Sequence, residues 1–185
     1  MSRVLNRIKI YLAGNLENIH LTKLNYINWR DKFEMLVKPM GIICLSPLKK
    51  TFKNFKNDSL QDNIDLKAKL ADGKYEEVSK EMKMIRQKDL RLVDIADVLI
   101  TYLDPSVPSW GTPNEIYLAE TLRKPSYLIL DGGFKNCPLW LTAVYSRDRI
   151  MDDIESMVKK LERLNEGSEE LDNRYWRLLT EEYLK

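Results

Sequence analysis

A nearly uninterrupted apolar stretch decides the fold of this chain: Ala96-Asp97-Val98-Leu99-Ile100-Thr101-Tyr102. Such a run is typical of a central parallel strand, because helices cover both faces of a parallel sheet and leave few positions for polar side chains. Apolar residues at helical spacing precede it over residues 75–93, and the helix-start signal Thr112-Pro113 follows it. We therefore predict a helix, a central strand and a second helix, in that order.

The same alternation continues on both sides of this unit. Further strands are expected over residues 8–13, 42–45, 127–130 and, as a short fifth strand, 142–145. Helices are expected over residues 26–37, 112–122 and 150–164. Strands that alternate with helices imply right-handed crossovers, so we predict an α/β fold with a doubly wound parallel sheet between two helical layers. Ligands of such sheets bind beyond the carboxyl ends of the strands.

One segment interrupts the alternation. Residues 49–74 are rich in Lys, Asn and Asp and poor in aliphatic side chains, which predicts a long, partly mobile loop or lid. A lysine-rich stretch is usually a solvated surface. Lys49 and Lys50 nevertheless lie just past a predicted strand end, where their side chains could bind a phosphate group.

Length and composition limit the classes of protein to consider. A chain of 185 residues suits one domain, which we expect over residues 1–165, with a helical extension over residues 166–185. No apolar run approaches the ~20 residues of a membrane span. A net charge of +2 provides no strong electrostatic attraction to nucleic acid. Two cysteines allow at most one disulfide, which fits the reducing cytoplasm. Together, these observations predict a soluble, cytoplasmic protein whose partners include neither a membrane nor nucleic acid.

Two carboxylates near the central strand are candidates for chemistry. Glu115 falls in the first turn of the predicted helix, where free backbone N–H groups and the helix dipole keep a carboxylate ionised. An ionised, positioned glutamate can attack an electron-poor carbon such as the anomeric carbon of a nucleoside. Asp89, near the end of the preceding helix, could protonate a leaving base if burial or a neighbouring carboxylate raised its pKa. From position alone, either carboxylate could instead be an ordinary helix-end or surface charge.

Loops after the first and third predicted strands supply the remaining candidates. The aromatic ring among them, that of Trp110, could stack on a base. We expect these loop residues to bind substrate: Gly14, Asn15, Asp104, Ser109, Trp110, Gly111 and Thr112. A single histidine, His20, favours neither a Ser-His-Asp triad nor a histidine-rich metal site, so no metal site is predicted.

Four short motifs in this order resemble the nucleoside 2'-deoxyribosyltransferase family: Tyr11-Leu12-Ala13-Gly14, Lys88-Asp89-Leu90, Ala96-Asp97-Val98, and Gly111-Thr112 ahead of Glu115-Ile116. The resemblance spans residues 8–130 and implies a flavodoxin-like fold. It also implies that Glu115 is the nucleophile, that Asp89 handles the base proton and that Tyr11 orients Glu115. The implied reaction transfers a 2-deoxyribosyl group through a covalent glutamyl-sugar intermediate, without metal or organic cofactor.

The resemblance implies further partners and leaves two alternatives open. Its members act on a small deoxynucleoside or deoxynucleotide and a free nucleobase, and they form homo-oligomers. Ser109 stands where transferases typically carry an aspartate, and the related 2'-deoxynucleoside 5'-phosphate N-hydrolases use serine there against the 5'-phosphate. Residues 14–18 lack the glycine-rich phosphate loop of those hydrolases. Hydrolysis of deoxynucleoside 5'-monophosphates is thus one alternative, and a catalytically silent nucleotide-binding module is the other.

Overall fold

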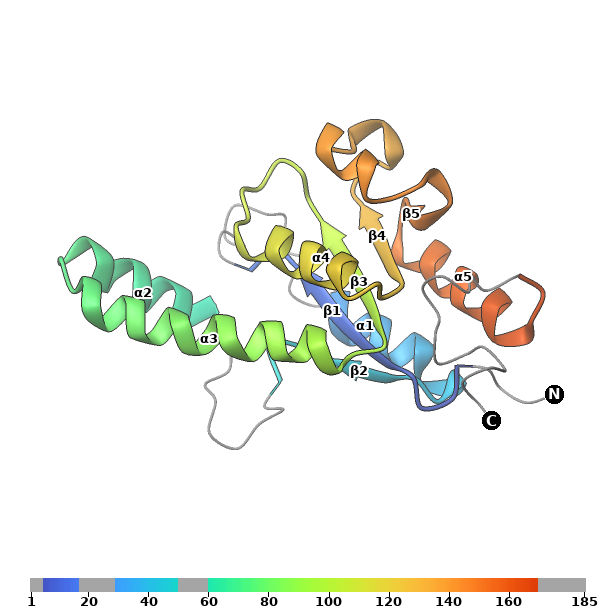
Figure 1. Ribbon diagram of the computed structural model, residues 1–185, viewed down its shortest axis with the longest axis horizontal. Coiled ribbons are helices and arrows are strands. Elements are labelled where there is room, and N and C mark those ends of the chain that lie inside the picture. Colours follow the sequence, from blue (N-terminus) through green and yellow to red (C-terminus); the bar gives the residue numbers. More distant parts are fainter. Residues whose placement is uncertain (1–4, 17–28, 50–59, 170–185) are drawn as a thin grey trace.

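The computed structural model describes residues 5–16, 29–49 and 60–169, and these residues form one five-stranded parallel sheet (Figure 1). The strands are β1 (Lys9–Gly14), β2 (Ile43–Leu45), β3 (Val98–Leu103), β4 (Ser126–Leu130) and β5 (Ile150–Met151). Their order across the sheet is β2-β1-β3-β4-β5, which is the flavodoxin-like order. The predicted doubly wound parallel sheet is therefore confirmed.

Helices cover both faces of the sheet, which confirms the predicted three layers. On one face, α1 (Trp29–Val37) and α5 (Ile154–Glu166) pack against Ile10 and Leu12 of β1. On the other, α3 (Tyr75–Ile95) and α4 (Gly111–Thr121) pack against Tyr11 and Ala13. Successive side chains of a strand point to opposite faces, so the apolar sequence of β1 serves two separate cores.

The segment expected to be a loop contains a helix instead, and that prediction is wrong. Within residues 49–74, α2 (Leu60–Ala71) lies against the first half of α3, and Figure 1 shows the pair projecting from the sheet. Leu66 is buried, whereas Ile64 and Leu70 stay about half exposed. The helix depends on its packing against α3, and a scan for a continuous apolar face does not reveal that partner.

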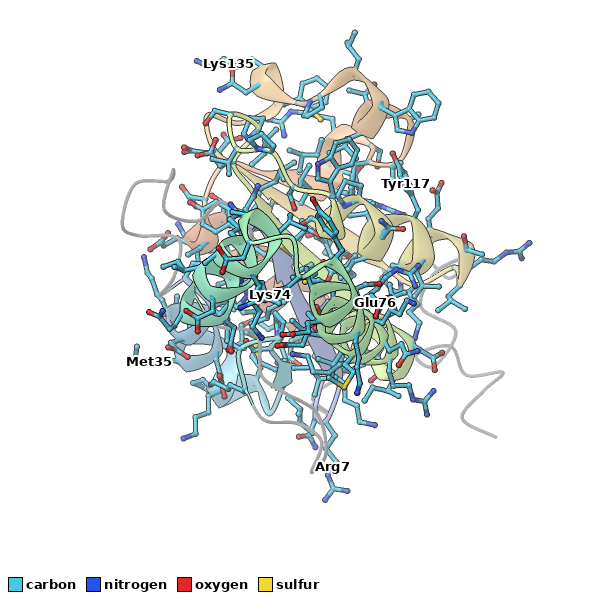
Figure 2. The ribbon with its side chains drawn as sticks, turned by 90° about the vertical axis from the view of Figure 1, so that its left-hand side faces the viewer. Arg7, Met35, Lys74, Glu76, Tyr117 and Lys135 are labelled. Atoms are coloured by element: carbon cyan, nitrogen blue, oxygen red, sulfur yellow. The ribbon has the colours of Figure 1, made fainter. Side chains whose placement is uncertain are left out.

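The turn between these helices is the outermost part of the structure. We call α2 together with residues 75–86 of α3 the helical arm. Lys69 of α2 lies 2.5 Å from Glu81 and 3.9 Å from Glu77, so ion pairs join the two helices. Figure 2 views the molecule along the arm and places Lys74 and Glu76 beside the turn, at the end that faces the viewer. The charged side chains of α2, which are part of what suggested a loop, lie on the surface of the arm.

The connection after β4 also differs from the prediction. Residues 142–145 are not a strand: three short 3-10 helices, Phe134–Asn136, Leu139–Ala143 and Arg147–Arg149, precede β5. The coiled backbone places the side chains of Leu141 and Tyr145 in the core under the sheet. The helix predicted over residues 150–164 begins later, because Ile150–Met151 form β5. Asp153 caps α5 by accepting a 2.6 Å hydrogen bond from the backbone N–H of Ser156.

The proposed division of the chain stays a prediction, because residues 170–185, where a last helix was expected, lie outside the described residues. Within the part of the chain that the structure describes, no helix is both long and apolar enough to cross a lipid bilayer.

Candidate active site

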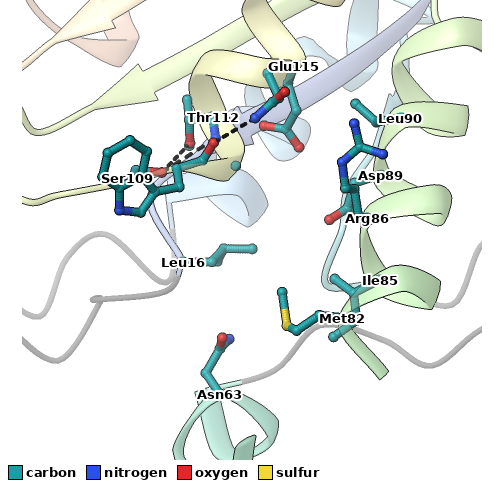
Figure 3. Close-up of a pocket in the computed structure, with 14 residues that line it drawn as sticks. Leu16, Asn63, Met82, Ile85, Arg86, Asp89, Leu90, Ser109, Thr112 and Glu115 are labelled. Atoms are coloured by element: carbon teal, nitrogen blue, oxygen red, sulfur yellow. Dashed lines mark hydrogen bonds between the residues drawn. The ribbon is translucent and has the colours of Figure 1, made fainter. Parts of the chain in front are cut away.

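A cavity of about 380 Å³ opens at the carboxyl ends of β1 and β3, the point at which the strand order reverses. Its volume falls within the range of small-molecule sites, and its place in the sheet is where doubly wound folds bind ligands. Figure 3 shows its walls coming from α3 on one side and from the start of α4 on the other. The cavity is lined by Gly14, Leu16, Asn63, Met82, Ile85, Arg86, Asp89, Leu90, Ser109, Trp110, Gly111, Thr112, Asn114 and Glu115.

Glu115 and Tyr11 meet at the inner end of this cavity. The phenol of Tyr11 donates a 2.6 Å hydrogen bond to Oε1 of Glu115 across 104 positions of sequence. Tyr11 is fully buried and Glu115 is 8% exposed. Burial, followed by the negative charges of Glu115 and Asp89, raises the pKa of Tyr11 well above its ordinary value of 10, so the phenol remains a donor.

The helix places Glu115 differently from the expectation. Because α4 begins at Gly111, Glu115 is its fifth residue and lies at the start of the second turn, not in the first. The dipole effect is confined to the first turn. The hydrogen bond from Tyr11 on β1, not the helix end, therefore fixes the orientation of the carboxylate.

Asp89 reaches the cavity from the opposite wall. It lies near the end of α3, its side chain is 15% exposed, and its Oδ1 is 3.5 Å from Nζ of Lys88. Lys88 is buried and donates a 2.9 Å hydrogen bond to the carbonyl of Pro47. In Figure 3, Glu115 comes from α4 and Asp89 from α3, and both border the open space. The two carboxylates thus bracket a site where a small molecule could lie.

Gly14 ends β1 where no larger residue fits. Its φ is +153°, and a Cβ added there would lie 2.4 Å from the carbonyl oxygen of Tyr102 on β3. Buried Arg30 of α1 holds the same strand end, donating to the carbonyls of Leu12 at 3.0 Å and Gly14 at 3.2 Å. The close approach of β1 to β3 shapes the floor of the cavity.

The start of α4 forms the other wall, and four predicted binding residues, Ser109, Trp110, Gly111 and Thr112, line it. The hydroxyls of Ser109 and Thr112 are 2.9 Å apart and hydrogen-bonded, and Oγ of Ser109 also accepts from the backbone N–H of Thr112 at 3.4 Å. The Trp110 side chain is 79% exposed, at the mouth of the cavity.

Two other predicted binding residues do not line the cavity. Asn15 is buried and connects two loops, since its Nδ2 donates to the carbonyl of Val107 at 2.9 Å and its Oδ1 accepts from the N–H of Asp104 at 3.2 Å. The carboxylate of Asp104 accepts from the N–H and the hydroxyl of Ser106. Both side chains hold the loop after β3 in shape through these hydrogen bonds.

Sequence reasoning missed seven lining residues, four of them on α3. Met82, Ile85 and Arg86 precede Asp89 by seven, four and three positions, the spacing that puts side chains on one face of a helix. That spacing could have identified them. Asn63 comes from the misread α2, while Leu16, Leu90 and Asn114 carried no signal of their own. The described residues contain no cluster of three or more His, Cys, Asp or Glu side chains able to hold a metal ion.

Comparisons with known proteins address the fold. No protein-family model matches the sequence, and no curated protein matches it. A conserved protein from Enterococcus faecalis has a similar structure, with a TM-score of 0.54 and 17% identity over 85% of this chain and 99% of that one. A 2-desoxiribosyltransferase from Leishmania mexicana has a TM-score of 0.51 and 15% identity over 84% of this chain and 97% of that one. The chain therefore has a nucleoside deoxyribosyltransferase-like fold.

Proposed function

We propose that this protein is an enzyme that transfers a 2-deoxyribosyl group between nucleobases through a covalent intermediate on Glu115. The observation that carries the proposal is the buried hydrogen bond from Tyr11 to Glu115 at the inner end of a cavity that Asp89 enters from the other side. A positioned nucleophile facing a proton donor across a small-molecule cavity is the arrangement that displacement at a sugar carbon requires. The fold shared with a 2-desoxiribosyltransferase supports the same class of reaction.

In the first half of the proposed reaction, a carboxylate oxygen of Glu115 attacks C1' of a deoxynucleoside. A glutamyl-sugar ester bond forms as the C1'–N bond breaks, and the bonding electron pair leaves with the base. Asp89 gives the departing base a proton, at N7 when the base is a purine, so the base leaves neutral. Tyr11 acts as a positioning residue, because its donated hydrogen bond fixes one oxygen of the nucleophile.

The second half reverses these steps with another base. A ring nitrogen of the incoming base attacks C1', the base gives a proton to Asp89, and the ester bond breaks to restore the Glu115 carboxylate. Two displacements at C1' leave the sugar in its original configuration. Four apolar side chains on the walls of the cavity supply contact surface for a flat base, namely Leu16, Met82, Ile85 and Leu90.

Hydrolysis of 2'-deoxynucleoside 5'-monophosphates is the second candidate, and one observation favours it. Ser109 lines the same cavity as Glu115 and lies just ahead of the N-terminus of α4. A hydroxyl beside the free N–H groups of a helix start suits a phosphate. Water would then replace the second base and release deoxyribose 5-phosphate.

One incubation separates these functions from a silent binding module. Purified protein is mixed with thymidine, with and without adenine, and then with deoxynucleoside monophosphates. Formation of deoxyadenosine supports transfer, while release of base that does not depend on adenine supports hydrolysis. Ligand binding without either product would contradict both enzymatic proposals. The predicted homo-oligomer is checked in the same preparation by light scattering.

A further inference from the structure

Among the described residues that line the cavity, Arg86 is the only one with a basic side chain. It lies on α3 at the inner end of the helical arm, is exposed, and faces the open space in Figure 3. The proposed transfer reaction gives Arg86 no role. A guanidinium at the wall of a small-molecule cavity can discriminate between ligands by the hydrogen-bond acceptors that they present to it.

The position of Arg86 relative to Asp89 shows which part of a substrate it would meet. Three residues of helix rise about 4.5 Å, so Arg86 lies one turn farther from the end of α3 on the same face. Asp89 receives the departing base, whereas Ser109 and Thr112 lie on the opposite wall with the start of α4. In Figure 3 the side chain of Arg86 extends along α3 toward Leu90, so its guanidinium lies on the same wall as Asp89 and beside a base that Asp89 protonates.

The chemistry of the guanidinium then limits the base. Arginine presents only donors, so it binds an oxygen or nitrogen acceptor and offers nothing to an amino group. In a 6-oxopurine, N7 and the O6 oxygen are adjacent acceptors on one edge. Asp89 at N7 and Arg86 at O6 would match this edge. In adenine, the group beside N7 is an amino donor, which would face the donors of Arg86.

We propose that Arg86 makes the site selective for 2'-deoxynucleosides of 6-oxopurines over those of 6-aminopurines. This inference rests on the proposed function, because it takes Asp89 as the group that receives the base. It names the substrate class that the catalytic pair alone leaves open. Asp89 and Glu115 act at the glycosidic bond, which all deoxynucleosides share, while Arg86 meets an atom in which the bases differ.

The test compares 2'-deoxyinosine with 2'-deoxyadenosine, which differ at C6 of the base. In the full-length protein, kcat/KM is measured for both donors with a common acceptor base, in the wild type and in Arg86→Met. The variant keeps an apolar stem and helix propensity but removes the donors. We expect the ratio of kcat/KM for deoxyinosine to that for deoxyadenosine to fall by about 10-fold or more, the discrimination typical of an arginine paired with base acceptors.

A matched control removes the same charge elsewhere on α3. Lys80 is exposed and lines a separate shallow groove, so Lys80→Met should leave the donor ratio unchanged. Equal losses for both donors in Arg86→Met, or no loss for either, would overturn the assignment. A selective loss for deoxyinosine 5'-monophosphate over deoxyinosine would also overturn it, because Arg86 would then be meeting a phosphate.

A binding measurement separates this inference from the proposed function. Wild-type protein that turns over no deoxynucleoside refutes the transfer reaction, whatever Arg86 does. Calorimetric titration with free hypoxanthine and free adenine needs no turnover. Tighter binding of hypoxanthine that Arg86→Met abolishes supports the role of Arg86 in base choice, and equal affinities of the two bases contradict it.

Discussion

The two ends of the cavity are built in different ways. At the inner end, Tyr11 and Glu115 project from β1 and α4, are buried, and are joined by a 2.6 Å hydrogen bond. At the outer end, the helical arm contributes Asn63, Met82 and Arg86 from two helices that project from the sheet. Met82 is 41% exposed and Arg86 is also exposed.

This difference separates chemistry from recognition. A nucleophile must keep one geometry within a fraction of an ångström, which the packed sheet and its helices provide. Side chains that determine substrate specificity need only contact the ligand, so they can lie on a smaller and less deeply packed element. Substitutions at the inner end should therefore reduce turnover, whereas those in the arm should change substrate choice and local stability.

The largest effect is expected from Glu115→Ala. Loss of the nucleophile should reduce the transfer rate by at least ~10³-fold, because no other group forms the covalent intermediate. Transfer of labelled base is measured under saturating donor. Glu120→Ala, on the exposed side of the same helix, is the control and should retain wild-type turnover. Near-wild-type turnover in Glu115→Ala would exclude the glutamate as nucleophile.

Asp89→Asn should follow, with a loss of about 10²-fold for natural deoxynucleosides, the usual contribution of general acid–base catalysis. The loss should shrink for a donor whose leaving group needs no proton. Rates are compared for thymidine and for an aryl 2-deoxyriboside with an acidic phenol. The control is Asp94→Asn, which alters a half-exposed carboxylate on α3. An equal loss for both donors would argue against proton transfer by Asp89.

Tyr11→Phe should cost about 10-fold in kcat, since it removes one hydrogen bond to a charged group and keeps the ring. The pKa of Tyr11 is raised above 10, so the phenol stays protonated and the hydrogen bond persists at pH 10. Stability from this bond is present below pH 10 and is lost only as pH rises towards the raised pKa. The ratio of wild-type to Tyr11→Phe rates should therefore stay constant from pH 7 to 10. A ratio that collapses near pH 10 would show an unperturbed phenol.

The smallest effect on turnover is expected from Leu66→Ala in the arm. Removal of this buried side chain should destabilise the contact of α2 with α3 by about 2 kcal/mol, the low end for a buried leucine. Hydrogen exchange should accelerate in residues 60–71 while the amides of β1 and β3 keep their protection. Leu70→Ala, at a position 48% exposed, is the matched control and should change little. Loss of protection throughout the sheet would show that the arm and the sheet unfold together.

Much of the frame was predictable from periodicity. Sequence patterns identified strands β1, β3 and β4 and helices α1, α3 and α5. A strand buried on both faces is a continuous apolar run, whereas a helix buried on one face has apolar residues spaced about one turn apart. The candidates Asp89 and Glu115 follow from the rule that parallel strands bring their carboxyl ends to one edge, whereas Tyr11 was implied by the resemblance to the deoxyribosyltransferase family. The structure brings all three to that edge.

Other features had no local signal. In α2, the buried Leu66 among charged side chains does not mark a helix, and packing against α3 supplies the rest of its stability. The two-residue β5 is too short to show alternation. Asn15 and Asp104 occupy the expected loops but turn their polar groups to the backbone, since loop N–H and carbonyl groups also require partners.

The sequence by itself determined the alternation of strands and helices, because burial imposes a periodic spacing of apolar residues that is visible without tertiary information. This alternation also determined which edge of the sheet carries the reactive side chains. Only the tertiary structure decided that Tyr11 holds Glu115 and that the helical arm brings Arg86 to the cavity. These relations join residues distant along the chain or depend on one helix packing on another. No local pattern encodes such contacts, which form when the elements are packed together.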